Sequence, residues 1–247
     1  MQLKDGRLLS SGKDGALFIY NKDNYEIEIS IKEHKDGISS CTQLNDERIV
    51  TCSKDHTIKI IKLTNDNKYI VESTLESHDN EVFKAIELKK NEIISISSDF
   101  TMKIWDFNTF KNTRTIVNRY CDNVLKVNEN EFATASLETK KVKFWNLNNY
   151  ELIIEIGGIF PSDCCQSMCL VEKDILLIGG VLRMYSIDVK QHQLIKEFTI
   201  QGMIWSIQKT LDGNILCSVY NLYHNNHIIK YKYDKDDLTT IYEKRKA

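Results

Sequence analysis

Residues 49–60 read IVTCSKDHTIKI, and residues 93–104 read IISISSDFTMKI, so a common pattern returns after 44 positions. Each stretch runs from apolar residues through small hydroxyl residues and an aspartate to a second apolar run. Repeating units of about 40 residues made of short β-rich runs predict an array of small sheets, because each sheet must stack on its neighbours to bury both faces. Such an array provides a broad binding surface, so the repeat favours recognition over catalysis.

Four short apolar runs separated by polar turns recur in the copies, which predicts four β-strands per unit. The clearest copies have predicted strands at 38–44, 48–53, 57–63 and 69–75, and at 82–88, 92–97, 101–107 and 114–118. The fifth copy has predicted strands at 165–171, 175–178, 182–187 and 194–200, and the sixth begins with one at 204–208. The whole chain is predicted to be one all-β domain of six units, at approximately 1–31, 32–76, 77–118, 119–156, 157–200 and 201–243.

The composition of the 247-residue chain limits its function classes. With 42% hydrophobic and 28% charged residues it fits a soluble globular protein. Its 33 basic and 35 acidic residues leave no overall field for a polyanion, so no nucleic-acid partner is expected. No segment approaches the roughly 20 apolar residues that span a bilayer, and the first residues lack a signal peptide. We therefore expect no membrane insertion and a cytoplasmic location, with the nucleus as the alternative.

The third copy has the fullest set of polar landmarks: His78 before its first strand, Ser95 in the second, Asp99 in the tight turn, and Trp105 followed by Asp106. This arrangement resembles the WD-repeat (tryptophan-aspartate repeat) family, and the resemblance covers nearly the whole chain. It implies a β-propeller in which the first four of these side chains form a buried hydrogen-bonded chain. A fully satisfied network of that kind fixes one geometry, so His78 is expected to be structural.

The other copies keep only parts of this set. The second has His34, Thr51 and Asp55, but Ile61 stands at the tryptophan position. The remaining landmarks are Ser10, Asp14 and Tyr20 in the first copy, Tyr120 (at the histidine position), Thr134 and Trp145 in the fourth, and Tyr185 and Tyr231 in the last two. Residues at the tryptophan position follow one another at intervals of 40 to 46 residues, which supports one array across the weak copies.

The sequence is compatible with two numbers of blades. Family members usually have seven blades and close by letting the first strand of the chain complete the last blade. This chain leaves only residues 1–4 for the first strand of its first copy and ends with its own fourth strand at 238–242. We expect either a six-bladed propeller with a degenerate first copy or part of a seven-bladed one, in which case the chain is a fragment.

The resemblance also implies a binding rim, formed by positions that flank the first apolar residue of each first strand and by the residue before the tight-turn aspartate. Carried over by position, the rim residues are Ser39, Glu81, Phe83, Leu125, Gln166, Met203, Trp205, Lys13, Lys54 and Ser98. Phe83, Met203 and Trp205 are expected to supply apolar anchors, and the charged residues to supply orientation. The alternative is that Phe83 and Trp205 pack between blades.

No set of residues predicts catalysis, a metal or a cofactor. His34 and His78 belong to the structural pattern, and His224 with His227 offers two ligands where a zinc site needs three or four. The seven cysteines include no Cys-x-x-Cys pair, and the chain has neither a phosphate-binding glycine loop nor a Gly-x-Ser-x-Gly elbow. We therefore expect no enzyme activity, no cofactor and no small-molecule substrate.

These observations predict a non-enzymatic WD-repeat scaffold that binds other proteins or peptides through its rim. The alternative is a substrate-recognition module of a larger enzyme assembly, linked to a ubiquitin ligase or a kinase, with catalysis on another chain or segment. The repeat does not specify the partner or the face that binds it.

Overall fold

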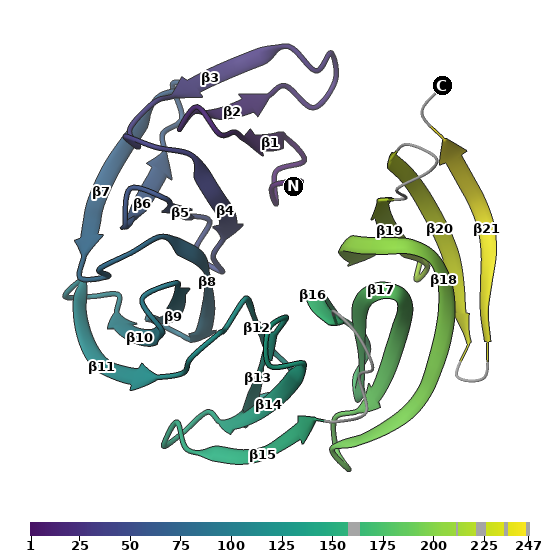
Figure 1. Cartoon of the computed structure of the whole chain (residues 1–247). Coiled ribbons are helices and arrows are strands. Elements are labelled where there is room, and N and C mark those ends of the chain that lie inside the picture. The colour runs from purple at the N-terminus through teal and green to yellow at the C-terminus, as the bar shows by residue number, and fades with distance from the viewer. Residues whose placement is uncertain (158–163, 211, 221–225, 235–236, 246–247) are drawn as a thin grey trace. The chain divides into compact units, whose positions relative to one another are not determined.

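The computed structural model describes residues 1–157, 164–210, 212–220, 226–234 and 237–245, and their regular structure is entirely β-strand. The chain divides into two compact units, Met1–Cys121 and Asp122–Ala247. Each unit consists of antiparallel sheets, here called blades, whose neighbouring strands lie side by side in Figure 1. The predicted all-β fold class is confirmed.

The first unit contains three blades. Blade 1 is β1 (Leu8–Ser11), β2 (Leu17–Tyr20) and β3 (Ile27–Ile31); blade 2 is β4 (Ile38–Gln43), β5 (Ile49–Ser53), β6 (Thr57–Leu63) and β7 (Tyr69–Glu76); blade 3 is β8 (Val82–Lys89), β9 (Glu92–Ser97), β10 (Thr101–Asp106) and β11 (Lys111–Val117). In place of a first strand, blade 1 has an isolated bridge between Gln2 and Leu8. This agrees with the shortened strand predicted at residues 1–4.

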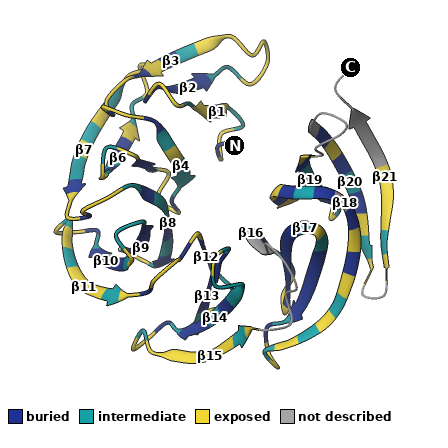
Figure 2. Ribbon diagram, in the orientation of Figure 1, coloured by how far each residue is buried: buried dark blue, intermediate teal, exposed yellow. Residues whose placement is uncertain are grey.

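Burial in blades 2 and 3 is greatest in the second strand and falls toward the outer strand (Figure 2). All five residues of β5 are buried, as are all residues of β9 except Glu92. Strands covered on both faces read as continuous apolar runs, which explains why the two repeated stretches show no alternation. The outer strand β11 has five exposed residues of seven.

The core of the first unit lies between its blades. One buried cluster joins blades 1 and 2 and includes Ile19 and Ile49, both fully buried. A second joins blades 2 and 3 and includes Ile60, Val82 and Trp105. Each blade therefore depends on its neighbour for most of its apolar burial, as expected for a stacked repeat.

The described residues of the second unit form one four-stranded and one six-stranded sheet. Blade 4 is β12 (Asn123–Lys126), β13 (Glu131–Ser136), β14 (Lys141–Asn146) and β15 (Leu152–Gly157); the larger sheet is β16 (Cys164–Glu172), β17 (Ile175–Asp188), β18 (Gln193–Lys209), β19 (Ile215–Tyr220), β20 (Asn226–Asp234) and β21 (Asp237–Arg245). The larger sheet combines the predicted fifth and sixth copies, so the described residues show six repeats.

Two strands of the larger sheet are longer than predicted. The expected strands at 175–178 and 182–187 form the single element β17. In Figure 1, β17 bends back on itself, and Leu182 has a left-handed φ of 59°. The prediction of two separate strands was wrong here, because the connection is so short that strand geometry continues through it.

The second long strand, β18, passes from one blade into the next. Its first half pairs with β17 and its second half with β19, so the predicted break at 200–204 was wrong. Gly202 makes the direct passage possible: it has φ 129°, and a Cβ there would lie 2.6 Å from the Tyr220 carbonyl oxygen. Only glycine fits such a position. The corresponding connection between β3 and β4 spans residues 32–37 and carries His34.

The core of the second unit follows the same plan as that of the first. One cluster joins blade 4 to the next repeat through Phe144, Leu176 and Tyr185, all fully buried. Another surrounds Ile204 and Cys217. Within the part of the chain that the structure describes, no helix is long and apolar enough to cross a membrane.

Candidate protein-interaction surface

The tight turn of blade 3 is held by the complete polar chain that the sequence predicted. Trp105 Nε1 donates to Ser95 Oγ at 2.8 Å, and Ser95 Oγ lies 2.7 Å from His78 Nε2. His78 Nδ1 lies 2.6 Å from Asp99 Oδ2. An ionised carboxylate only accepts hydrogen bonds and an indole N–H only donates. The proton order therefore runs from Trp105 through Ser95 and His78 to Asp99, and makes His78 a neutral imidazole protonated at Nδ1.

Burial and hydrogen bonding set the ionisation of this chain. Burial lowers the pKa of His78, and the nearby Asp99 carboxylate only partly opposes that shift. Burial would raise the pKa of Asp99, but hydrogen bonds from Thr101 and His78 outweigh it and hold that pKa below its usual value. With His78 only 7% exposed and both ring nitrogens occupied, His78 is a structural residue and not a general base.

Blade 2 contains a shorter version of the same chain. His34 Nδ1 lies 2.9 Å from Asp55 Oδ2, and His34 Nε2 lies 2.8 Å from Thr51 Oγ1. Ile61 replaces the tryptophan and is buried in the core between blades 1 and 2. Hydrogen bonds from Thr57, the Lys35 backbone N–H and His34 outweigh burial and hold the pKa of Asp55 far below its usual range.

The other blades keep only fragments. In blade 4, Trp145 Nε1 donates to Thr134 Oγ1 at 2.9 Å. Tyr120, at the histidine position by sequence, is 37% exposed and its ring packs edge-on against Phe100 instead. Ser10 and Tyr20 of blade 1 share a hydrogen bond of 3.0 Å. Ala16 N donates to Asp14 Oδ1, and Tyr185 and Tyr231 are buried in the second unit.

Three of the predicted rim residues occupy β-bulges at the start of a first strand. The pairing register shifts around Ser39 in β4, around Phe83 in β8 and around Trp205 in β18. A bulge leaves one residue outside the ladder and redirects its side chain. The repeat therefore places an unpaired residue at the same point of three blades, and alternation along the sequence does not reveal it.

In the first unit, the predicted rim residues form a connected polar cluster. Glu81 Oε1 accepts a hydrogen bond from Ser39 Oγ at 3.0 Å and lies 3.5 Å from Lys54 Nζ. The Glu81 carbonyl accepts hydrogen bonds from the N–H of Ser98, at 3.0 Å, and from its hydroxyl. Lys13 is exposed beside Gly37, where a Cβ would lie 3.1 Å from the Lys13 Cα. This cluster joins blades 2 and 3.

In the second unit, the rim residues differ from one another. Trp205 is 57% exposed, so the alternative that it packs between blades does not hold. Met203 is half-buried and pairs with Val181 and Tyr220, and Leu125 packs against the core of blade 4. Phe83, in the first unit, is half-buried. The side chain of Gln166 lies outside the described residues.

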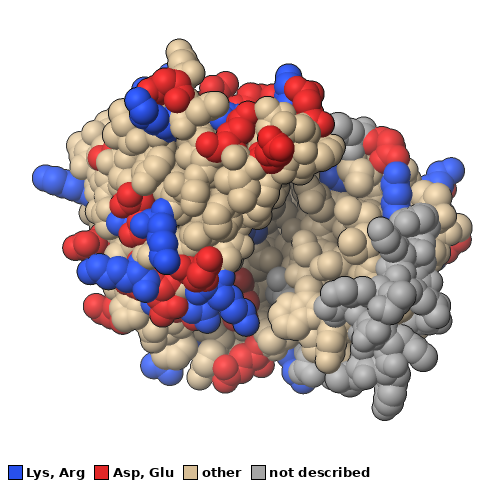
Figure 3. Space-filling model, turned by 90° about the horizontal axis from the view of Figure 1, so that it is seen from above, with Lys and Arg blue, Asp and Glu red and all other residues tan. Residues whose placement is uncertain are grey.

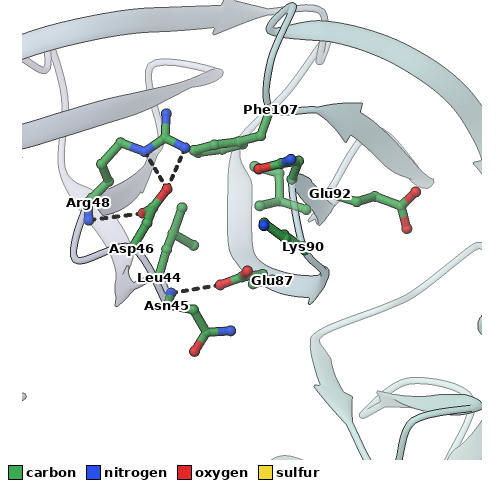
Figure 4. A pocket seen from close by; sticks show the side chains of 10 residues that line it. Leu44, Asn45, Asp46, Arg48, Glu87, Lys90, Glu92 and Phe107 are labelled. Atoms are coloured by element: carbon green, nitrogen blue, oxygen red, sulfur yellow. Dashed lines mark hydrogen bonds and ion pairs between the residues drawn. The ribbon is translucent and has the colours of Figure 1, made fainter.

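The opposite end of blades 2 and 3 has a cavity that the sequence analysis missed. Its volume is about 380 Å³, and it is lined by Leu44, Asn45, Asp46, Arg48, Glu87, Lys90, Asn91, Glu92, Ile93 and Phe107. Figure 4 shows the Arg48 guanidinium over the Phe107 ring, 4.1 Å from its centroid, and bonded to Asp46. Arg48 also contacts Glu72 at 3.1 Å. The cavity forms between two turns that only the strand register brings together.

An exposed aromatic pair beside the rim was also missed. Phe100 is 44% exposed, and its ring centroid lies 5.2 Å from that of Tyr120. One feature of the sequence could have indicated this pair: Phe100 follows the tight-turn aspartate at the position that Gly15 occupies in blade 1. Both residues have left-handed backbone, with φ 65° at Phe100 and 74° at Gly15. His56 holds the same position in blade 2 with φ 70°, so the left-handed backbone is shared by these turns and the large exposed ring is what distinguishes blade 3.

The histidines and cysteines of the described residues lie in several separate places. The described part of the chain contains no group of three or more His, Cys, Asp or Glu side chains arranged to hold a metal ion. His227 is buried, whereas its predicted companion His224 lies outside the described residues. Burial raises the pKa of the Cys52 and Cys217 thiols to about 12, which keeps both protonated and poorly nucleophilic.

Charged side chains of both signs are interspersed on the face shown in Figure 3, in keeping with the near balance of the whole sequence. No single-sign field covers this face.

Comparison with known proteins identifies the repeat and the fold. The family model described as WD domain, G-beta repeat, matches residues 26–62, which run from the outer strand of blade 1 through the third strand of blade 2. The chain is similar to the crystal structure of the WD40 β-propeller domain of Doa1, with a TM-score of 0.74, 18% sequence identity, and coverage of 87% of this chain and 73% of that chain. Comparison with curated proteins gives no match. The chain therefore contains a WD repeat at residues 26–62 and shares the WD40 β-propeller fold.

Proposed function

We propose that this protein is a non-enzymatic scaffold that binds other proteins or peptides through the predicted rim. WD40 β-propellers are commonly interaction modules, which supports this general role. The observation that carries the proposal is the repeated bulge: Ser39, Phe83 and Trp205 leave the strand ladder at the same point of three blades. A regular strand turns alternate side chains into the core, whereas a bulge residue is released for contact.

The chemistry of these positions suits a protein partner. Trp205 supplies a large amphipathic surface with few rotatable bonds, which is typical of residues that dominate interface energy. The Ser39–Glu81–Lys54 cluster is partly satisfied and partly exposed, so it orients a polar partner group without burying an unpaired charge. The same surface suits a substrate-recognition module of a larger enzyme assembly, in which a different chain or segment performs the chemistry.

We place the protein in the cytoplasm. The supporting observation is that seven cysteines occur without a paired motif, and that the thiols of Cys52 and Cys217 are buried. Such thiols are typical of a reducing compartment. Fractionation of the source cells tests this location, and recovery of the protein in a secreted or organellar fraction would contradict it.

The test of the scaffold role compares partner capture by the intact chain with capture by a Trp205→Ala variant and a Lys54→Glu variant. Ile70→Ala is the matched control, because Ile70 is 54% exposed on the outer strand of blade 2. Each bait is checked for folding by circular dichroism, and captured proteins are quantified by mass spectrometry. Loss of an exposed tryptophan anchor is expected to weaken binding by about 2 kcal/mol.

A discrete set of partners that survives in Ile70→Ala but is lost in Trp205→Ala supports the rim as the binding surface. The identity of those partners separates a free scaffold from a recognition module, since a ligase or kinase component favours the second. Partners that bind all three variants equally contradict the rim assignment.

A further inference from the structure

The outer strand of blade 3 differs in charge from its counterparts. β3, β7 and β15 contain glutamate and no lysine or arginine, whereas β11 contains Lys111 and Arg114 and no acidic residue. Just beyond β11, Arg119 is a third exposed cation. The preceding carboxylate, Asp106, is engaged in a turn, where it accepts hydrogen bonds from Thr109. The outer edge of blade 3 is therefore locally basic in a protein whose net charge is −2.

This basic strand is also a sheet edge. β11 pairs on one side with β10 and ends the sheet order of blade 3. An edge strand presents unpaired backbone N–H and C=O groups, and cations on it discourage pairing with basic or apolar strands. The same cations favour a strand of opposite charge. Lys111 and Arg114 are both exposed.

An apolar cluster lies at the C-terminal end of this edge. Val117, the last residue of β11, is 74% exposed and pairs with Thr101, which directly follows Phe100. Phe100 and Tyr120, with 44% and 37% exposure, stack edge to face. The backbone of Asn118 donates to the Phe100 carbonyl at 2.9 Å and ties the end of β11 to the tight turn.

The strand register places Lys111 and Arg114 on one face of β11, across from Asp106 and Ile104, and Val117 on the other face, across from Thr101. The basic and the apolar groups therefore border the same sheet edge from its two faces.

The aromatic pair is maintained at some conformational expense. Phe100 has φ 65° and Tyr120 has φ 57°, a region that costs bulky residues roughly 1–3 kcal/mol. Gly15 occupies the equivalent turn of blade 1 with φ 74°, so the turn itself does not require an aromatic residue. Tyr25 shares this combination of left-handed backbone and exposed ring, so the distinguishing feature of Phe100 and Tyr120 is their contact with each other.

We propose that β11 and the Phe100–Val117–Tyr120 cluster form a docking site for an extended acidic segment of a partner protein. The segment lies along the outer edge of β11, with its carboxylates beside Lys111, Arg114 and Arg119. An apolar residue of the segment rests on the cluster. This site is separate from the bulge residues of the rim, and it specifies a partner chemistry that the rim does not.

The test uses a synthetic extended peptide of alternating glutamate and threonine with one phenylalanine near its end, titrated into the intact chain by isothermal calorimetry at low and at physiological salt. We expect binding that weakens as salt rises. The double variant Lys111→Glu/Arg114→Glu is expected to bind about tenfold more weakly. The double variant Phe100→Gly/Tyr120→Ser should lose the preference for the phenylalanine peptide over one with alanine in its place.

Lys62→Glu is the matched control, because Lys62 is an exposed cation on β6 of blade 2. Protection of β11 amides from hydrogen exchange in the presence of the peptide provides a second measurement, independent of any variant. Three results would each overturn the proposal. The peptide does not bind, or Lys62→Glu and the β11 double variant bind it equally well, or a peptide with lysine in place of glutamate binds as well as the acidic one. Tighter binding of a single-stranded oligonucleotide than of the peptide would also overturn it, in favour of a polyanion site. The rim variants Trp205→Ala and Lys54→Glu should leave peptide binding unchanged, which keeps this test distinct from the scaffold test.

Discussion

Blades 2 and 3 contain the same His–Asp pair and the same buried hydroxyl, and they differ in what lies behind that hydroxyl. In blade 3 the Ser95 hydroxyl accepts from Trp105, whereas in blade 2 the Ile61 side chain offers no donor to Thr51. Both blades nevertheless form complete four-stranded sheets. The comparison teaches that the hydrogen bonds among histidine, hydroxyl and aspartate are sufficient to hold the tight turn. The tryptophan adds a hydrogen bond that links this turn to the core.

The largest expected effect comes from removing the shared hydroxyl. Ser95→Ala leaves both Trp105 Nε1 and His78 Nε2 without their partner, and each buried unpaired group costs about 1–3 kcal/mol. We expect a loss of about 3 kcal/mol in the free energy of unfolding. Thr51→Ala removes the partner of His34 Nε2 and should cost about half as much. Urea unfolding of both variants measures the difference.

Ser95→Thr and Thr51→Ser retain a hydroxyl and serve as controls for these substitutions. Equal losses in Ser95→Ala and Thr51→Ala would show that Trp105 contributes through packing alone.

A slightly smaller effect is expected from transplanting the tryptophan into blade 2. Ile61 is 1% exposed in the core shared with blade 1, so Ile61→Trp overfills a packed site. We expect it to destabilise the protein by about 2 kcal/mol although it restores the repeat pattern. Thermal unfolding compares the midpoint of Ile61→Trp with that of an Ile61→Leu control. A higher midpoint for Ile61→Trp would mean that blade 2 can accommodate the tryptophan of the full polar chain.

The pH dependence of stability tests the ionisation of both pairs. Burial lowers the pKa of His34 and His78 below the ordinary 6.5. Below pH 6.5 the unfolded chain therefore binds protons that the folded chain rejects, and stability falls. The lowered pKa of Asp55 and of Asp99, ordinarily 3.8, adds a second loss as the pH falls below about 4. Unfolding midpoints measured from pH 7 down to about pH 2 should show both phases.

Histidine variants show which blade causes the loss of stability below pH 6.5. His78→Gln and His34→Gln should each flatten the decline between pH 7 and pH 5, at a lower overall stability. A midpoint that rises on acidification would mean that the histidines are stabilised as cations by their aspartates.

The smallest effect concerns the turn residue with left-handed backbone. His56 in blade 2 has φ 70° and Phe100 in blade 3 has φ 65°. Glycine relieves this conformation, so His56→Gly is expected to stabilise the protein by about 0.5 kcal/mol. Phe100→Gly should be near neutral, because the relief is offset by loss of the ring contact with Tyr120, worth about 0.5–1.5 kcal/mol. Differential scanning calorimetry compares the unfolding midpoints of His56→Gly and Phe100→Gly. His56→Ala is the control, because alanine removes the side chain but keeps the unfavourable left-handed backbone.

The same two blades show how far the sequence alone specifies the fold. The predicted strands at 57–63 and 92–97 match β6 and β9 at both ends, because their apolar runs are bounded by a turn and an aspartate. β11 begins three residues earlier than predicted, since Lys111 looks like part of a turn until its pairing with Asp106 is known. Polar outer strands are specified by their neighbours and not by their own pattern.

The candidate surface was less predictable than the buried chain. The His78 and His34 contacts followed from the repeat because residue type and spacing both identify them. The exposure of Trp205 depends on a bulge, which shifts the register without a sequence signature. The cavity beside Arg48 and Phe107 depends on two turns more than 40 residues apart along the chain.

The contrasting burial of the three tryptophans gives the protein a built-in optical reporter. Trp105 is 3% exposed and Trp145 6%, both with Nε1 bonded, whereas Trp205 is 57% exposed. Two indoles should therefore emit as shielded fluorophores, and the third at longer wavelength and open to aqueous quenchers. Iodide quenching of the native protein measures the solvent exposure of Trp205, which reports on the rim. The intensity of the blue-shifted emission from Trp105 and Trp145 reports whether blades 3 and 4 are folded. Occupancy of the rim and loss of fold thereby become separable in a single unlabelled sample.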